Sequence, residues 1–354
     1  MSSASPAPGD DRIAAAMELA IDLAEQVRGR TSPNPPVGAV ILDEYGALAG
    51  TGATRPPGGP HAEVMALRQA GPRARGGTAV VTLEPCNHHG RTGPCAEALL
   101  DAGVTAVHYA VADPNPQASG GADRLRACGL TVTAGVRAEQ VASGPLRAWL
   151  HRVRTGRPQL TWKYAATLDG RSAAADGTSQ WITGPVARER VHAERGRIDA
   201  IVVGTGTVLA DDPALTARLP DGTLSATQPL RVVVGRRDIP PGARILDDSA
   251  PTVHLRTDDP HEVLAALAAE HCDVQLEGGP RLAAAFLRAG LVDRVQAYLA
   301  PVLIGAGQGA VGDLGIGTIS AALRFHRESV DVLGEDILLT LVPDGPAADC
   351  QEDR

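Results

Sequence analysis

Aromatic residues are scarce in this chain: two Phe, four Tyr and three Trp make up 3% of its 354 residues. An aromatic-rich core is therefore excluded, and Ala, Val and Leu must supply most of the buried apolar surface. Cysteine is also rare, with five residues, an odd number that argues against a disulfide framework. In a chain without an export signal, free thiols or metal ligands are the expectation.

Two further absences exclude whole classes of function. No apolar run reaches the roughly 18–20 residues of a membrane span, and residues 1–11 lack the basic flank and apolar stretch of a secretory signal. The formal net charge of −8 argues against broad attraction to nucleic acid, which requires basic surface. We therefore expect a cytoplasmic protein that binds neither membranes nor nucleic acid. Two or three Arg or Lys side chains would still suffice to hold a phosphorylated small molecule.

A chain of 354 residues is too long for one ordinary core, so we expect two domains. The residues around 151–158 are basic, contain Gly and Pro, and show no apolar face. The expected order is a disordered tail at 1–10, a first domain at 11–150, a linker at 151–158, a second domain at 159–343, and a polar tail at 344–354.

Strand and helix patterns alternate in both halves, which predicts α/β domains. In the first half, the alternation predicts a mostly parallel sheet with helices on both faces. Its expected strands are 37–42, 46–51, 78–83, 106–111 and 130–133, and its expected helices are 10–27, 121–128, 139–150 and one each after His61 and Pro94. In the second half, the expected strands are 160–165, 200–203, 230–234, 253–255, 273–276, 293–299 and 337–341, and the expected helices are 185–195, 260–270 and 280–289, each opening with Pro.

The first half contains a zinc-deaminase pattern. His61-Ala62-Glu63 precedes a helix, and two Pro-Cys units follow at Cys86 and Cys95, as in the signature H-x-E followed by P-C-x-x-C. A catalytic zinc takes three protein ligands and keeps one position open for water, whose pKa it lowers to about 7. We therefore assign His61, Cys86 and Cys95 as ligands and Glu63 as the residue that moves protons.

The spacing between the cysteines is C-x8-C rather than C-x2-C, and the intervening loop offers His88 and Arg91 to a substrate. The competing interpretation is a structural zinc site, in which His88 or His89 would supply a fourth ligand.

The second half is less decisive from its residues alone. Gly204-Thr205-Gly206-Thr207 and Glu277-Gly278-Gly279-Pro280 each follow a strand, and two such junctions point to one ligand crevice. A tight turn is the alternative for the first junction, and a capped turn is the alternative for Asp211. Lys163 could equally face solvent from its strand, and Arg195 and Arg218 could be surface charges.

Several stretches resemble the bifunctional riboflavin-biosynthesis deaminase–reductase family. SPNPPVG (32–38), GPHAE (59–63) and VTLEPCNHHGRTGPC (81–95) are similar to its deaminase half. LTWKYAATLDGR (160–171), SQWITG (179–184), DAIVVGTGTVLADDPALTAR (199–218) and EGGPRLAAAFLRAGLVD (277–293) are similar to its reductase half, in the same order.

The resemblance implies a cytidine-deaminase-like three-layer αβα domain followed by a dihydrofolate-reductase-like α/β domain. It implies zinc-dependent deamination of 2,5-diamino-6-ribosylamino-4(3H)-pyrimidinone 5′-phosphate, then NADPH-dependent reduction of the ribosyl side chain of 5-amino-6-(5-phosphoribosylamino)uracil to ribityl. Besides this substrate, the expected partners are further copies of the chain, as a dimer or tetramer.

The resemblance also implies individual roles. In the first site, Asn34 and His88 contact the pyrimidine and Arg91 the phosphate. In the second site, Asp211 lies at the reacting carbon. The ribose phosphate would be held by Lys163, Ser179, Trp181, Arg195 and Arg218, and the cofactor would be lined by Thr183, Gly204, Gly206, Thr207, Glu277, Gly278 and Gly279.

Two positions depart from the family pattern: Gly93 replaces a Pro, and Asp293-Arg294 replaces Asp-Glu. We expect the first to leave the ligands intact and the second to change only surface charge. Two rival hypotheses remain. One is a deaminase of another base whose second half is a binding or assembly module, and the other is a zinc-stabilised sensor with a fully protein-ligated metal.

Overall fold

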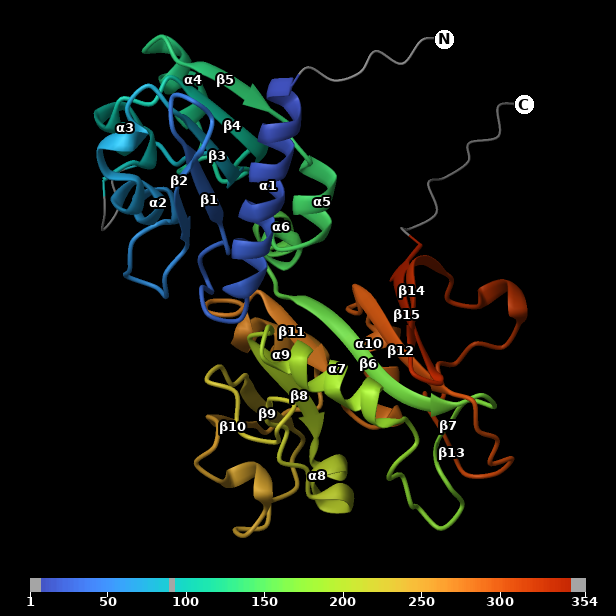
Figure 1. The fold of residues 1–354 in the computed structure, drawn as a ribbon. Helices are drawn as coiled ribbons and strands as arrows, with labels where there is room; N and C mark the ends of the chain where they lie inside the picture. Colours follow the sequence, from blue (N-terminus) through green and yellow to red (C-terminus); the bar gives the residue numbers. More distant parts are fainter. Residues whose placement is uncertain (1–7, 89–92, 345–354) are drawn as a thin grey trace, which may run out of the picture. The chain divides into compact units, whose positions relative to one another are not determined.

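The computed structural model describes residues 8–88 and 93–344 and divides into two compact units, Met1–Arg157 and Pro158–Arg354. Each unit is built around its own sheet, as the alternating pattern predicts (Figure 1). Residues 1–7 and 345–354 lie outside the described residues. Helix α1 (Pro8–Gln26) begins inside the segment 1–10, which was predicted to be a disordered tail. In the described ranges, no helix combines the length and hydropathy that a membrane crossing requires.

The segment predicted as a linker, 151–158, contains the division between the two units, which falls after Arg157, but most of it is helical. Helix α6 (Arg147–Thr155) continues through most of this segment, and β6 begins at Gln159. The apolar side of α6 lies in its first turn, where Ala148, Trp149 and Leu150 are buried. Arg152 and Arg154 occupy its last turn, where positive charge is favourable beside the helix C-terminus. The basic residues therefore end a helix.

The sheet of the first unit is mixed, contrary to the mostly parallel sheet expected. Its order is β2-β1-β3-β4-β5, with β1 antiparallel to both β2 and β3, and β4 parallel to both β3 and β5. The crossover from β2 through a helix makes β3 parallel to β2, so β1, which lies between them, opposes both. The strands are β1 (Gly38–Leu42), β2 (Leu48–Ala53), β3 (Thr78–Leu83), β4 (Ala106–Val111) and β5 (Thr131–Ala134).

Helices cover both faces of this sheet. Successive residues of a strand point to opposite faces, so glycines of β1 and β2 can lie against different helices. Gly38 faces α1: a Cβ added there would lie 1.9 Å from the oxygen of Ala20. On the other face, a Cβ at Gly52 of β2 would lie 2.2 Å from the oxygen of Ala62 in α2 (Ala62–Ala70). This flush contact fixes the start of α2 against the sheet. The remaining helices are η1 (Gly71–Ala74), α3 (Cys95–Ala102), α4 (Gly121–Ala127) and α5 (Ala138–Ser143).

The second unit has an eight-stranded sheet in the order β10-β9-β8-β11-β6-β12-β15-β14. The six strands from β10 to β12 are parallel, and β15 and β14 add antiparallel pairs at one end. The strands are β6 (Gln159–Thr167), β8 (Ala200–Gly204), β9 (Leu230–Val234), β10 (Thr252–Leu255), β11 (Asp273–Leu276), β12 (Arg294–Ala300), β14 (Phe325–Leu333) and β15 (Asp336–Pro343). A small separate sheet pairs β7 (Arg171–Ala173) with β13 (Gln308–Gly309).

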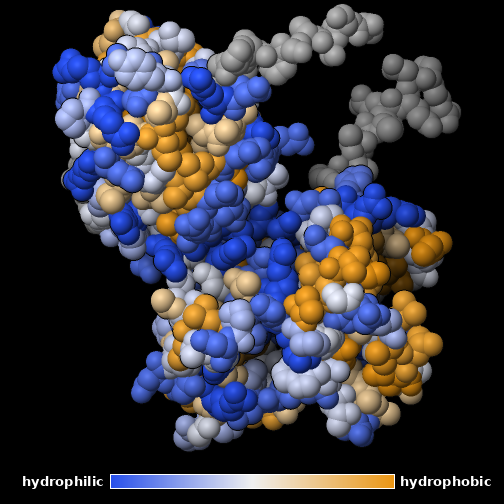
Figure 2. Space-filling model, in the orientation of Figure 1, coloured by the Kyte–Doolittle hydropathy of each residue, from blue (hydrophilic) through white to orange (hydrophobic). Residues whose placement is uncertain are grey.

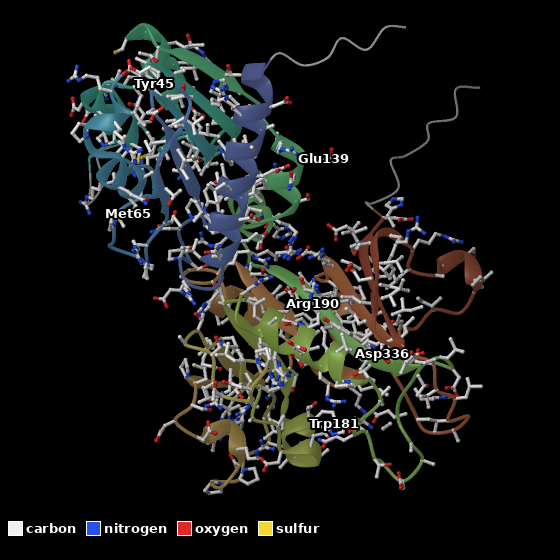
Figure 3. The ribbon with its side chains drawn as sticks, in the orientation of Figure 1. Tyr45, Met65, Glu139, Trp181, Arg190 and Asp336 are labelled. Carbon is white, nitrogen blue, oxygen red and sulfur yellow. The ribbon has the colours of Figure 1, made fainter. Side chains whose placement is uncertain are left out.

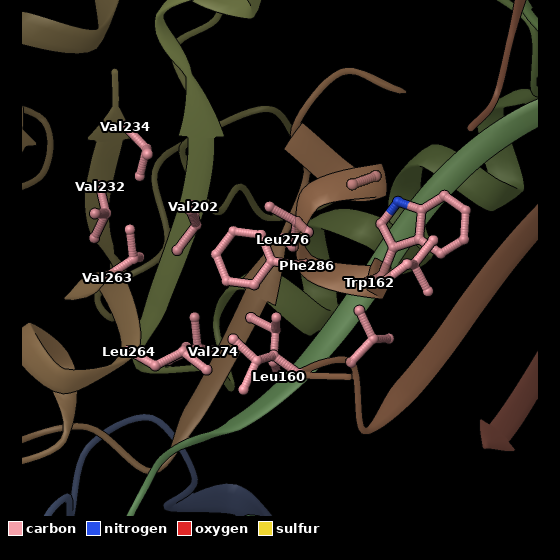
Figure 4. Packing of buried hydrophobic residues seen from close by; sticks show 14 of the residues in the cluster. Leu160, Trp162, Val202, Val232, Val234, Val263, Leu264, Val274, Leu276 and Phe286 are labelled. Carbon is pink, nitrogen blue, oxygen red and sulfur yellow. The ribbon is translucent and has the colours of Figure 1, made fainter. Parts of the chain in front are cut away.

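The two faces of this sheet bury different clusters. One face packs Leu160, Trp162, Val202 and Leu276 against Phe286, a residue of α10 (Pro280–Arg288) (Figure 4). Val263 and Leu264 of α9 (Pro260–Leu267) complete that cluster. The opposite face is covered by α7 (Pro185–Arg195), α8 (Thr205–Asp211) and the short helix η2 (Arg244–Leu246). A further short helix, η3 (Ile319–Ala321), precedes β14.

A fully buried guanidinium holds the loops beside β9. Arg231 donates to the main-chain oxygens of Ala214, Asp247 and Ala250 and pairs with the Asp247 carboxylate at 2.8 Å. It thereby fixes the segment that follows α8.

Arg294 also does more than change surface charge. Its side chain is 18% exposed, and its Nη2 lies 2.5 Å from the Glu328 carboxylate of β14. We expected the Asp293-Arg294 departure to change only surface charge, but Arg294 forms a partly buried ion pair with Glu328. At Gly93, by contrast, an added Cβ would meet open space.

Candidate active sites

His61, Cys86 and Cys95 converge in the first unit. His61 is the residue before α2, Cys86 follows the end of β3, and Cys95 is the first residue of α3. His61 Nδ1 lies 3.6 Å from Cys86 Sγ and 3.3 Å from Cys95 Sγ. All three ligand atoms lie within 4.8 Å of one another, the only such cluster of metal-binding side chains in the described part of the chain. One imidazole and two thiols at this spacing fit the three protein ligands of a catalytic zinc.

The structure supplies no fourth ligand from the residues it describes. His88 is exposed and lies outside the cluster, whereas His89 and Arg91 fall outside the described residues. The predicted role of Arg91 therefore stays a prediction. Asn34 lies in the loop before β1, where its N–H donates to the oxygen of Thr31 at 2.8 Å, and its contact with the pyrimidine also stays a prediction.

The two thiols are electrostatically unequal. Hydrogen bonds from Cys95 and His61 lower the pKa of Cys86 to about 4, against the opposing effect of burial. The backbone N–H of Cys95 also donates to Cys86 Sγ at 3.4 Å. The hydrogen bond to Cys86, together with burial, raises the pKa of Cys95. Cys86 is therefore the first of the pair to ionise.

Glu63 lies in the first turn of α2 and is 4% exposed. Burial, followed by the charge of Cys86, raises the pKa of its carboxyl to about 7. A carboxyl that titrates near neutrality is suited to accept and release a proton within one catalytic cycle.

A residue that the sequence argument missed lies directly before Pro85-Cys86. Glu84 is 8% exposed, and its carboxylate accepts hydrogen bonds from the N–H groups of Asp113, Gly120 and Ala122. The signal available in the sequence was its position between a buried strand and a ligand. Glu84 ties the strand end that leads to Cys86 to the loop before α4.

In the second unit, Glu277 lies at the centre of an ion-pair cluster. Its carboxylate receives Arg195 Nε and Nη2 at 3.0 and 2.8 Å, and Lys163 Nζ lies 3.7 Å away. The side chains of Lys163, Arg195 and Glu277 are 15%, 13% and 8% exposed, so Lys163 and Arg195 are not free surface charges. The structure thus brings three predicted residues together. Glu277, which was expected to line the cofactor, forms ion pairs with Lys163 and Arg195, the two cations expected to hold the phosphate.

The charges of this cluster perturb one another. Burial raises the pKa of Glu277, but the charges of Arg195 and Lys163 outweigh it and lower the pKa to about 2. Burial, followed by the charge of Arg195, lowers the pKa of His192, whose Nδ1 lies 3.1 Å from the oxygen of Thr216. Sequence reasoning missed His192, which shares this oxygen with Arg195.

The two glycine-containing junctions meet at neighbouring strands. β8 and β11 are adjacent and parallel, so the turns after Gly204 and Leu276 lie at the same edge of the sheet. The N–H of Gly279 donates to Thr207 Oγ1 at 3.2 Å, which joins the junctions directly. Gly204 precedes helix α8, where the sequence analysis expected no helix and left a tight turn as the alternative to a ligand-binding junction, and Gly206 lies in the first turn of this helix.

The remaining predicted residues lie on two loops and at the end of α8. Ser179 Oγ donates to the carboxylate of Asp211 at 3.5 Å. Trp181, labelled in Figure 3, is 70% exposed, and the Arg188 guanidinium lies 4.7 Å from its ring centre. Arg188 also donates to the oxygen of Thr183. Arg218 donates to the oxygen of Gly222 at 2.8 Å, in a turn separate from the Glu277 cluster.

Comparison with known proteins assigns both units. The family model "cytidine and deoxycytidylate deaminase zinc-binding region" matches residues 11–111, and "RibD C-terminal domain" matches residues 158–339. "Riboflavin biosynthesis protein RibD" of Mycobacterium tuberculosis strain H37Rv is 61% identical over 327 residues, which cover 92% of this chain and 96% of that protein. The chain belongs to the RibD family.

Solved structures of RibD proteins agree over nearly the whole chain. Acinetobacter baumannii RibD (form 1) has a TM-score of 0.85 and 38% identity, covering 95% of this chain and 100% of that one. A diaminohydroxyphosphoribosylaminopyrimidine deaminase/5-amino-6-(5-phosphoribosylamino)uracil reductase from Thermotoga maritima has a TM-score of 0.86 and 32% identity, with the same coverage. The predicted α/β fold, a deaminase-like domain followed by a reductase domain, is confirmed.

Membership in the RibD family also settles the class of activity. The chain is a bifunctional enzyme of riboflavin biosynthesis, with a zinc-binding deaminase domain and an NADPH-dependent reductase domain. The two rival hypotheses, a zinc-stabilised sensor and a deaminase whose second half only binds or assembles, are therefore rejected.

Proposed function

We propose that the first unit deaminates 2,5-diamino-6-ribosylamino-4(3H)-pyrimidinone 5′-phosphate and that the second reduces the ribosyl group of the product to ribityl. The observation that carries this proposal is the pairing, within one chain, of the His61–Cys86–Cys95 cluster beside Glu63 with the Lys163–Glu277–Arg195 cluster. The Thermotoga maritima relative, whose name states these two activities, supports the choice of substrate.

In the deaminase unit, His61, Cys86 and Cys95 would hold the zinc, which when bound activates water for attack at neutral pH. Glu63 takes a proton from the attacking water and passes it to the ring nitrogen, and it then passes the proton of the newly added hydroxyl to the departing amine, which leaves as ammonia. Its burial beside the ligands keeps competing water from its carboxyl. Asn34 and His88 orient the pyrimidine, and Arg91 holds the phosphate.

In the reductase unit, NADPH supplies the hydride and the protein orients its partner. Lys163, Ser179, Trp181, Arg195 and Arg218 hold the ribose phosphate, and Asp211 lies at the reacting carbon. Glu277 fixes the two buried cations in place, in addition to its expected place at the cofactor. The cofactor lies against Thr183, Gly204, Gly206, Thr207, Gly278 and Gly279, because the paired junctions offer backbone N–H groups at one sheet edge.

The direct test supplies the diaminopyrimidine phosphate to zinc-loaded protein, with ammonia release and NADPH oxidation followed separately. We expect ammonia release without NADPH, and NADPH oxidation only after deamination has begun. A control with the deaminated compound should oxidise NADPH at once. Ammonia release without any NADPH oxidation in either arm would refute the reductase assignment.

We also propose that the chain assembles as a homodimer or tetramer through the end of the second sheet. Strand β14 has only one neighbour, β15, and an unpaired edge invites pairing with another chain. Apolar surface gathers on this part of the unit (Figure 2). Exposed apolar residues on these strands and the adjoining loops are Leu168, Val302, Leu303, Ile319, Leu323, Val330, Val332 and Ile337.

Light scattering after gel filtration checks the assembly. The wild-type chain should elute with the mass of two or four copies, and Val332→Lys should shift it toward one copy, because Val332 is 75% exposed on β14. A wild-type chain that remains monomeric at micromolar concentration would contradict this arrangement.

For the cellular location we propose the cytoplasm. This location suits the four cysteines that the described residues contain, all of which are free thiols.

A further inference from the structure

One arginine outside the predicted sites contacts the chain beside both cysteine ligands. Arg124 lies on α4, which neighbours α3 (Figure 1). Its Nη1 donates to Asn87 Oδ1 at 3.2 Å, and its Nη2 lies 2.6 Å from Glu97 Oε1. Asn87 directly follows Cys86, and Glu97 follows Cys95 by two residues. A single guanidinium thus joins the two ends of the Cys86–Cys95 loop.

The helix that carries Arg124 is itself fixed to the first of these ends. Glu84 Oε1 accepts from the N–H groups of Gly120 and Ala122 at 3.1 and 3.0 Å, at the start of α4. A Cβ added at Gly121 would lie only 1.8 Å from the oxygen of Pro85, so the helix start lies directly against the Pro85–Cys86 turn. The start of the helix that carries Arg124 is therefore held against the turn that carries Cys86.

A second contact closes the same arrangement. The N–H of Asn87 donates to the oxygen of Ala118 at 2.9 Å, and Ala118 is buried in one cluster with Cys86 and Cys95. The segment before α4, the helix and the two ligand-bearing turns thus form one hydrogen-bonded assembly. Arg124 is the member that reaches the second turn through an ion pair.

We propose that Arg124 is a positioning residue of the zinc site, holding the two cysteine-bearing turns at the separation that the metal requires. The proposal rests on the zinc site and not on the identity of the pyrimidine. Without the guanidinium, the loop ends can adopt more arrangements in the metal-free protein, and binding must pay their ordering entropy. Residues that orient metal ligands indirectly typically affect metal affinity by about 10–100-fold.

The test compares zinc release from full-length, zinc-loaded protein into a chromogenic chelator. Arg124→Met should release zinc about 10-fold faster than wild type, near the lower end of the indirect effects. Arg124→Lys should fall between the two, because an ammonium cannot reproduce the two-pronged contact of a guanidinium. Arg126→Met is the matched control, since Arg126 lies on the same helix and forms an exposed ion pair with Asp123. It should behave as wild type.

Two further measurements separate positioning from general loosening. The cobalt-substituted Arg124→Met protein should show altered thiolate-to-cobalt absorption bands, while its reduction of the deaminated intermediate by NADPH stays at the wild-type rate.

Glu97→Gln should reproduce part of the faster zinc release. The double variant should release zinc no faster than Arg124→Met, because both changes remove the Arg124–Glu97 ion pair. If Arg124→Met matches Arg126→Met in both zinc release and cobalt spectrum, or if the Arg124 and Glu97 effects simply add, the proposal is overturned. Should Arg124→Met not fold, Arg124→Lys and Glu97→Gln decide by the same readouts.

Discussion

Replacing Glu63 by Gln is expected to lower the deamination rate by about 10²–10⁴-fold, the usual contribution of a positioned acid–base group. The amide preserves the shape of a side chain that is 4% exposed, but it cannot take up and release the proton. Zinc content should stay at one ion per chain, because Glu63 is not a member of the ligand cluster. Ammonia release with the diaminopyrimidine phosphate measures the effect.

The control for this variant lies in the same unit. Glu18→Gln removes a surface carboxylate that pairs with Arg137, and deamination should be unchanged. Both variants should reduce the deaminated intermediate with NADPH at the wild-type rate. Substantial deamination by a zinc-loaded Glu63→Gln protein would show that another group moves the proton.

Replacing Glu277 by Gln is expected to abolish most reductase activity and to lower the free energy of unfolding by about 3–5 kcal/mol, as when one partner of a buried ion pair is removed. Lys163 and Arg195 would keep their charges while losing the carboxylate between them. Denaturant unfolding measures stability, and NADPH oxidation with the deaminated intermediate measures activity. Asp258→Asn, which breaks the exposed Arg236–Asp258 pair, should change neither.

The same variant should change the acid sensitivity of the chain. In the folded state the pKa of Glu277 is about 2, below its ordinary value of 4.5. This carboxylate therefore contributes stability that is fully present above pH 4.5 and is lost as the pH falls toward 2. The stability difference between wild type and Glu277→Gln should shrink over that interval. A difference that is constant from pH 5 to pH 2.5 would contradict the assigned ionisation.

The parts of the fold that the sequence could predict are those with strong local signals. The strand 78–83 coincides with β3, and the helix 185–195, which opens with Pro, coincides with α7. The zinc cluster was predictable for the same reason, because each ligand lies at the end of a strand or the start of a helix, beside a His-x-Glu or Pro-Cys unit.

Other features depend on tertiary structure and carry little local signal. Strand β14 was missed because none of its residues is fully buried and polar residues interrupt its apolar ones, so that pairing with β15 alone defines it. Helix α8 was missed because Gly204 and Gly206 are typical of a turn, yet Val208 is buried against β8. The central place of Glu277 could not be inferred from spacing, since its partners lie 82 and 114 residues away in sequence, at Arg195 and Lys163.

The flush contact between β2 and α2 has a consequence for how this enzyme family can vary. Where Gly52 meets the start of α2, an added Cβ would lie 2.2 Å from the oxygen of Ala62 and 2.5 Å from the nitrogen of Ala66. Any larger residue at this position would therefore push the start of α2 away from the sheet. Because His61 directly precedes α2, such a substitution would also change the distance from its imidazole to the two sulfurs.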